Sequence, residues 1–92
     1  MAIAVETIFP GGTQEMYENV AGRVVPNQQL PEGCRLHVAG PVDEGWRVFT
    51  VWESREHLER FREEKLLPAL QETGFEGDAA AQVNPAYRVI IA

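Results

Sequence analysis

The stretch that decides the fold is residues 46–58, which read WRVFTVWESREHL. Aromatic and β-branched residues fill most of its first seven positions, which is typical of a strand buried in a sheet. Ser54 follows, and a serine at this point caps a helix that we expect over residues 55–73, with Gly74 at its end. The centre of the chain therefore holds a strand that runs directly into a long helix.

The sequence on either side supplies the remaining elements. Thr13 is an N-cap residue before an apolar stripe with helical spacing, and a six-residue turn over 40–45 separates two strand-like segments. The expected elements are, in chain order, strands at 2–9, 34–39, 46–53 and 87–91 and helices at 14–25 and 55–73.

This β-α-β-β-α-β order predicts an α+β, ferredoxin-like fold, with a four-stranded antiparallel sheet and two helices on one face. The 92 residues leave room for one core, so we expect a single domain over 1–92. Pro68 lies inside the second helix, and the apolar spacing slips between Phe61 and Leu66. Both features predict a kink or a break between Glu63 and Pro68.

The sheet is expected to be apolar on both faces. A turn centred near Asp43 pairs Val38 with Val48 and Leu36 with Thr50. The side chains then expected under the helices are Cys34, Leu36, Val38, Trp46, Val48, Thr50 and Trp52. Those expected on the other face are Arg35, His37, Ala39, Arg47, Phe49, Val51 and Glu53. Because Phe49 and Val51 make this second face apolar, we expect a homodimer joined sheet to sheet into an α/β barrel.

Composition excludes several classes of partner. The net charge of −6 argues against nucleic acid and anionic membranes, because both require a basic surface. No apolar run approaches the ~20 residues of a membrane span and no signal peptide is recognised, so we expect a cytoplasmic protein. The one cysteine, Cys34, allows no intrachain disulfide. No residues have the spacing of a metal site, so neither a metal nor a cofactor is expected.

Residues 51–58, VWESREHL, together with Phe61 and Pro68-Ala69-Leu70, resemble the dimeric α/β-barrel superfamily that includes the antibiotic-biosynthesis-monooxygenase-like proteins. The resemblance covers nearly the whole chain and implies a homodimer, with a cavity between sheet and helices in the members that bind ligands. Many members are small bacterial proteins of unassigned role, some are cofactor-independent oxygenases of polycyclic aromatic compounds, and others bind and degrade haem. The haem-degrading members use a histidine near the position of Phe61 or Arg62. This sequence has no histidine there, so haem degradation is not carried over.

Four residues are expected to line a ligand pocket: Trp52, Thr50, Tyr17 and Phe61. Trp46 lies on the same side of its strand as Trp52, and the two form an aromatic wall for a flat ligand. The alternative is that both are ordinary core residues, with Trp46 closing the end of the hairpin.

The catalytic candidates are His37, Asn19 and Tyr17. His37 changes charge near neutral pH and could act as a general base or as a metal or haem ligand; alternatively it is an interface histidine hydrogen-bonded across the dimer to Glu6 or Glu53. Asn19 and Tyr17 lie on the first helix, where the resemblance implies a polar asparagine near the substrate, or they are ordinary helix residues.

Three further features have a structural interpretation. Cys34 is expected to be a small buried hydrophobe and His57 an exposed residue of the first helical turn. The outer face of the second helix is expected to carry the ion pairs Glu56–Arg60, Arg60–Glu64 and Glu59–Arg62.

The leading functional hypothesis is a homodimeric small-ligand protein that, if it is an enzyme, oxidises an aromatic compound without a cofactor. The second hypothesis is a non-catalytic module that only binds its ligand. The third is a purely structural homodimer in which the layer between sheet and helices is filled. A cavity in the structure discriminates the third hypothesis from the first two.

Overall fold

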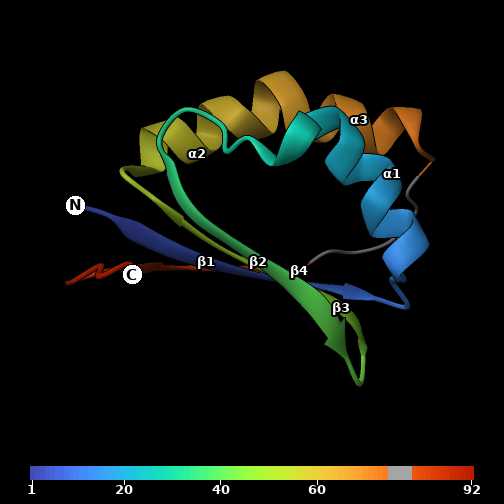
Figure 1. Ribbon diagram of the computed structural model, residues 1–92, viewed down its shortest axis with the longest axis horizontal. Coiled ribbons are helices and arrows are strands. Elements are labelled where there is room, and N and C mark those ends of the chain that lie inside the picture. Colours follow the sequence, from blue (N-terminus) through green and yellow to red (C-terminus); the bar gives the residue numbers. More distant parts are fainter. Residues whose placement is uncertain (75–79) are drawn as a thin grey trace.

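The computed structural model describes residues 1–74 and 80–92, which form a four-stranded antiparallel sheet with helices across one face (Figure 1). The strands are β1 (Ile3–Pro10), β2 (Cys34–Val42), β3 (Gly45–Trp52) and β4 (Ala80–Pro85), in the spatial order β2-β3-β1-β4. The helices are α1 (Gln14–Val24), α2 (Arg55–Phe61), η2 (Arg62–Leu66) and α3 (Leu67–Glu72), with a short 3₁₀ turn η1 (Pro26–Gln28). This arrangement confirms the predicted ferredoxin-like α+β fold.

Both predicted helix caps are confirmed. The Thr13 side-chain oxygen accepts a hydrogen bond from the Met16 N–H at 3.2 Å, and the Ser54 oxygen accepts one from the His57 N–H at 3.2 Å. Each bond satisfies one of the N–H groups that the first helical turn leaves free. The caps therefore fix the two points at which the chain leaves the loop before α1 and the end of β3 to cross the sheet.

The irregularity predicted in the second helix is present, as a π-helical segment rather than a break. Within η2 the chain keeps helical backbone angles, and the Leu67 N–H donates to the Arg62 carbonyl five residues earlier. The wider turn adds one residue, so Leu66 takes the inward position that Lys65 would occupy in a regular helix. Pro68 then falls in the first turn of α3, where its missing N–H is tolerated.

The β2–β3 hairpin is longer than predicted, and its register is different. The turn is only Asp43–Glu44, so Val38 lies opposite Phe49 and not Val48, and His37 lies opposite Thr50. Since a slip of one residue moves every side chain of a strand to the other face, Leu36 and Val38 lie on the face away from the helices. The predicted faces of β3 are correct, and those of β2 from Leu36 onward are wrong.

A β-bulge at Arg35 restores the prediction for Cys34. The register shifts between Cys34 and Leu36, so Cys34 lies opposite Trp52 and remains on the helix side. The extra residue is exposed, and its guanidinium pairs with the Glu53 carboxylate at 3.8 Å. The bulge thus lets both Cys34 and His37 face the helices, although they are separated by two residues.

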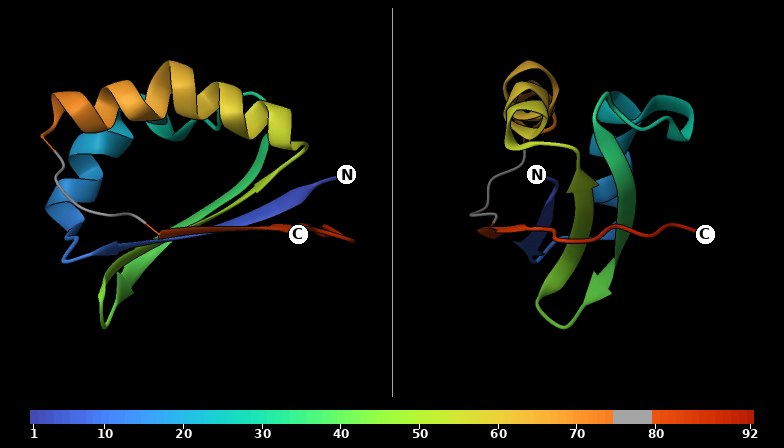
Figure 2. Two further views of the ribbon diagram at one scale, coloured as in Figure 1. Left: turned by 180° about the vertical axis from the view of Figure 1, so that it is seen from behind. Right: turned by 90° about the vertical axis from the view of Figure 1, so that its left-hand side faces the viewer.

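The last strand is not where the sequence predicts it. β4 ends at Pro85, which lies opposite Ile3, and the predicted residues 87–91 are outside the sheet. β4 is an edge strand, where Pro85 costs no ladder hydrogen bond. Its sequence is only weakly typical of a strand, and pairing with β1 stabilises it. Residues 86–92, red in Figure 2, run along the open face of the sheet and contribute to a hollow there with Ala4, Leu36, Phe49 and Val51.

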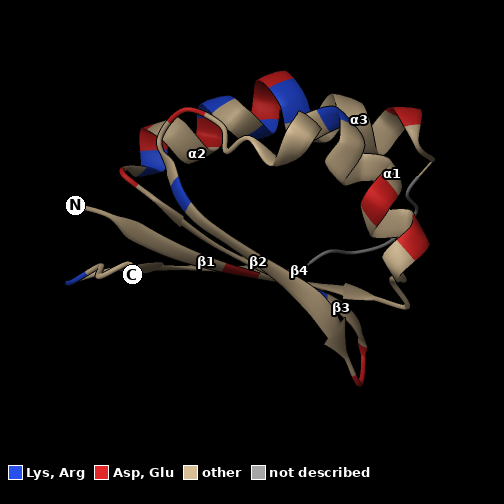
Figure 3. Cartoon of the chain, in the orientation of Figure 1, with Lys and Arg blue, Asp and Glu red and all other residues tan. Residues whose placement is uncertain are grey.

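Packing between helices and sheet is centred on Trp52, which is 1% exposed. It forms a cluster with Ile3, Val5, Cys34 and Leu58, against which Phe61 and Val83 pack. Charged residues lie mainly on the helices and turns (Figure 3). No helix in residues 1–74 and 80–92 combines the length and the apolar composition needed to cross a membrane.

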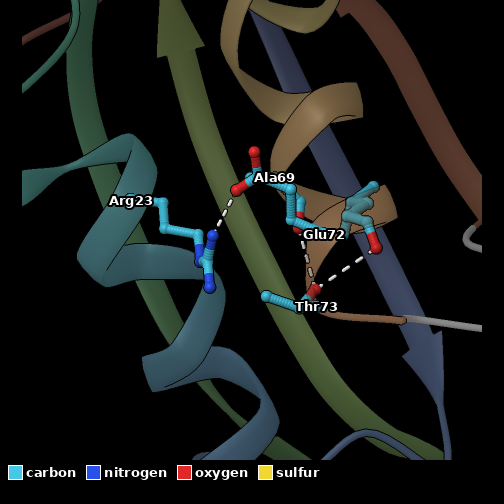
Figure 4. Close-up of polar contacts among 5 residues, drawn as sticks. Arg23, Ala69, Glu72 and Thr73 are labelled. Carbon is cyan, nitrogen blue, oxygen red and sulfur yellow. Dashed lines mark hydrogen bonds and ion pairs between the residues drawn. The ribbon is translucent and has the colours of Figure 1, made fainter.

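Helices α1 and α3 are connected to each other near their C-terminal ends. Arg23 near the end of α1 forms an ion pair with Glu72 at the end of α3 (Figure 4). The Thr73 hydroxyl next to it donates to the Ala69 carbonyl at 2.9 Å and closes the last turn of α3. These contacts hold α1 and α3 side by side across the same end of the sheet.

Candidate functional site

A cavity of about 490 Å³ lies between the helices and the sheet. Its walls come from β1, α1, β2, β3 and the helices that follow β3, and they are largely apolar. The volume falls in the range of ~300–1,000 Å³ that is usual for small-molecule sites. The hypothesis of a filled layer between helices and sheet is therefore wrong.

Trp52, Thr50 and Phe61 meet on one wall of the cavity. The rings of Trp52 and Phe61 are tilted by 41° with their centroids 5.1 Å apart, and the Trp52 indole N–H donates to the Thr50 hydroxyl at 2.9 Å. This bond satisfies the indole, so the wall offers a ligand aromatic surface and no free donor from Trp52. The structure brings these three predicted pocket residues together.

Tyr17 and His37 form a hydrogen-bonded polar pair in the cavity. The Tyr17 hydroxyl lies 2.7 Å from His37 Nε2, and both residues line the cavity. Their ring centroids are 6.0 Å apart, and Tyr17 also lies 5.3 Å from the ring of Trp46. Because His37 lies opposite Thr50, the pair sits between the two tryptophans along β3.

The predicted orientation of His37 is wrong, and the hairpin turn explains why. A turn of two residues puts His37 on the helix side of the sheet rather than on the open face. The carboxylates expected to bond it have other partners: Glu6 pairs with Arg47 at 2.9 Å and Glu53 with Arg35. The sequence contains no signal for this, because Gly40 to Gly45 is compatible with turns of several lengths.

Burial sets the protonation states of the pair. Burial raises the pKa of Tyr17, with a further contribution from the negative charge of Glu18. Burial lowers the pKa of His37 below its usual value of 6.5, because the imidazolium is poorly solvated there. At neutral pH the cavity therefore holds a protonated phenol next to a neutral imidazole.

Trp46 lies closer to this pair than the sequence indicates. It is 9% exposed and lines the cavity beside Tyr17, and its indole N–H is buried without an acceptor among the described residues. A buried donor without a partner is unfavourable unless a water or ligand oxygen accepts from it. Trp46 is thus a site candidate in addition to closing the hairpin end.

The other candidates have structural roles or lie elsewhere. Asn19 is exposed on α1 and does not line the cavity. Cys34 is buried in the cavity wall, and burial raises the pKa of its thiol, as expected of a small hydrophobe rather than a nucleophile. His57 bonds the Ser54 hydroxyl through Nδ1 at 2.7 Å and is half-buried, not fully exposed as predicted.

No metal centre is evident in the part of the chain that the structure describes, where no three histidine, cysteine or carboxylate side chains are grouped to hold an ion.

Arg62 lines the cavity, although the sequence predicts it on the outer face of the helix. Its predicted pair with Glu59 is not formed among the described residues, and neither is Arg60–Glu64, whereas Glu56–Arg60 is present at 3.5 Å.

The chain shares its fold with several solved α/β proteins, so the predicted resemblance to the antibiotic-biosynthesis-monooxygenase-like proteins is confirmed at the level of the fold. Rv0793 from Mycobacterium tuberculosis superposes with a TM-score of 0.71 and 16% identity, over 97% of this chain and 98% of that one. SnoaB from Streptomyces nogalater, a cofactor-independent oxygenase, superposes with a TM-score of 0.67 and 14% identity, over 97% and 95%.

A third structure with this fold is a candidate antibiotic biosynthesis monooxygenase from Deinococcus radiodurans, with a TM-score of 0.59 and 15% identity over 100% of this chain and 98% of that one. No protein family matches the sequence, and no curated protein is similar to it in sequence.

Proposed function

We propose that this protein binds a flat aromatic compound in the cavity and that Tyr17 and His37 remove a proton from a hydroxyl group of that compound. The observation that carries the proposal is the 2.7 Å contact between the Tyr17 hydroxyl and His37 Nε2 inside a largely apolar cavity of about 490 Å³. The tryptophans and Phe61 supply ring-shaped surface on either side of that contact.

The pair can act as a proton relay. A tyrosine hydroxyl has one hydrogen to donate and lone pairs with which to accept. In the tautomer with Nε2 unprotonated, Tyr17 donates to His37 and accepts from the ligand hydroxyl. Movement of both protons leaves an imidazolium at His37, a neutral Tyr17 and an oxyanion on the ligand. The neutral starting state follows from burial, which lowers the pKa of His37 and raises that of Tyr17.

The reaction we propose is oxidation of this anion by O₂ without a cofactor. An electron-rich aromatic oxyanion can transfer an electron to O₂, which its protonated form does far less readily. With anthrone, whose enol carries such a hydroxyl, the methylene carbon loses two hydrogens and gains one oxygen atom. The other oxygen atom leaves with these hydrogens as water, so no reductant is needed. The shared fold with SnoaB, a cofactor-independent oxygenase, supports this reaction class.

The test combines binding and turnover. Titration with hydroxylated aromatics of two to four rings is expected to quench tryptophan fluorescence, and anthrone is expected to cause O₂ uptake above the uncatalysed rate. Tyr17→Phe and His37→Gln should each lower the enzymatic rate by roughly a hundredfold, the usual contribution of general-base catalysis. Asn19→Ala is the matched control, because Asn19 is on the same helix as Tyr17 but outside the cavity.

The outcomes separate the functional hypotheses. Quenching with O₂ uptake that depends on both residues supports the oxygenase. Quenching without O₂ uptake for any of the hydroxylated compounds supports the non-catalytic binding module instead. Absence of quenching across the whole series contradicts both, because the cavity would then hold none of the ligands its shape favours.

We also propose that two copies associate through the open face of the sheet, as the sequence analysis predicts. Val38 remains 46% exposed on this face. The tail that runs along it adds Ile90 and Ile91, which are 84% and 48% exposed. Covering such apolar surface contributes about 25 cal/mol per Å², which favours a partner that presents the same surface.

A further inference from the structure

Arg62 is an unusual member of the cavity wall. Of the described residues that line the cavity, it is the one that carries a permanent charge. A guanidinium beside apolar walls loses part of its hydration, which is costly unless an anion compensates. The charge of Arg62 therefore requires a nearby anion to compensate for the lost hydration.

Helical spacing explains why an arginine reaches the cavity. Arg62, the first residue of η2, is four residues after Leu58, which packs into the core, so it lies on the inward face of the helix. Lys65 would follow on the same face of a regular helix, but the wide turn moves Leu66 there and leaves Lys65 exposed. The regular spacing from Leu58 thus places Arg62 at the cavity, and the irregular turn that follows keeps Lys65 outside.

Arg62 has no carboxylate partner within residues 1–74 and 80–92. Four other arginines form ion pairs, which are Arg23–Glu72, Arg35–Glu53, Arg47–Glu6 and Arg60–Glu56. Arg55 and Arg88, like Arg62, form none among the described residues, but neither of them lines the cavity. The cation is therefore available to a ligand. It is also adjacent in sequence to Phe61, whose ring packs against Trp52 at the aromatic wall.

We propose that the ligand is an aromatic carboxylate and that Arg62 binds its carboxylate group. The forked N–H donors of a guanidinium match the two oxygens of a carboxylate, and Arg62 stands beside the wall where the ring would lie. This inference rests on the proposed function, since it names the substrate class of the same cavity. It makes Arg62 a residue that determines specificity and assigns it no part in proton transfer.

The test uses two probes of nearly equal shape, anthraquinone-2-carboxylate and anthraquinone-2-carboxamide, titrated by calorimetry at pH 7.5. An ionic strength of about 0.15 M limits the Debye length to about 8 Å, so the repulsion of the anion by the net charge of −6 is largely screened. We expect the carboxylate to bind roughly tenfold more tightly than the amide, as a charge-assisted hydrogen bond requires. Arg62→Gln should abolish this difference and leave the affinity for the amide unchanged.

Arg55→Gln is the matched control, because it removes the same charge from an exposed position of the same helix outside the cavity. It should leave the preference for the carboxylate intact, and Arg62→Lys should restore part of it. Equal affinity of the wild-type protein for both probes overturns the inference and leaves the proposed function standing. An equal loss of both probes in Arg62→Gln overturns it too. If neither probe binds the wild-type protein, the inference and the proposed aromatic site fail together.

Discussion

His37 and Tyr17 are polar residues that are half-buried and are also the proposed proton-transfer groups. Each is half-buried in a cavity with mostly apolar walls, and each satisfies the other through one hydrogen bond of 2.7 Å. A polar pair in such surroundings is costly when only one partner is removed, because the other remains without a hydrogen bond. Substitutions at either position are therefore expected to affect stability as well as the proposed proton transfer, and the two effects require separate measurements.

The lowered pKa of His37 makes stability depend on pH in a defined direction. Between its pKa in the folded protein and the usual value of 6.5, the unfolded chain binds a proton that the folded protein does not. The contribution of His37 is therefore complete above pH 6.5 and is lost as the pH falls toward the folded-state value. We expect the urea midpoint of the wild-type protein to fall more between pH 7.5 and pH 5.5 than that of His37→Gln.

His57→Gln is the control for this comparison, since it removes the other histidine, which lies outside the cavity at the start of α2. Loss of the hydrogen bond with Ser54 should lower its midpoint at both pH values and leave the dependence on pH like that of the wild type. If the two variants respond to pH in the same way, the burial of His37 does not govern the effect.

At the scale of elements, the turn before β2 depends on close contact between a glycine and a histidine. Gly33 has a φ of +83°, and a β-carbon there would lie 2.4 Å from the His57 ring. Gly33→Ala should destabilise the protein by about 1–3 kcal/mol, because it combines an unfavourable φ with a steric clash. Urea unfolding measures the change.

The matched substitution is Gly22→Ala in α1. A β-carbon at this position meets nothing within 4 Å, and alanine is favoured over glycine in a helix interior. This variant should gain about 0.5–1 kcal/mol, opposite in sign to the change at Gly33. A loss of stability at both positions would show that the surroundings of Gly33 are not the cause.

The elements that follow from local chemistry could be predicted from the sequence. Thr13 and Ser54 cap their helices, and Pro68 marks the irregular helix, because these signals act within a few residues. The errors arise where distant pairing decides. β4 is selected by its partner β1, and the face of His37 is set by the Asp43–Glu44 turn. In the candidate site, the sequence correctly predicts four lining residues, which are Trp52, Thr50, Phe61 and Tyr17. The inward position of Arg62 is seen only in the structure.

At the scale of the whole molecule, the open face of the sheet provides a test of association. We expect light scattering at micromolar concentration to give the mass of a dimer. Val38→Lys should shift the protein to a monomer, because it places a charge within the proposed interface. Leu30→Lys should not, although Leu30 and Val38 are each 46% exposed, since Leu30 follows η1 and lies outside the sheet. A wild-type monomer under these conditions would rule out the proposed association.

The Asp43–Glu44 turn has a consequence for how such cavities diversify. The length of this turn fixes which alternate side chains of β2 face the helices. A slip by one residue would therefore replace His37 in the cavity with Leu36 and Val38. The insertion of a single codon in a solvent-exposed hairpin tip can thereby replace an acid–base group with hydrocarbon, while every helix and strand stays in place. The proton relay proposed here would therefore depend on the length of a loop as much as on the side chains of Tyr17 and His37.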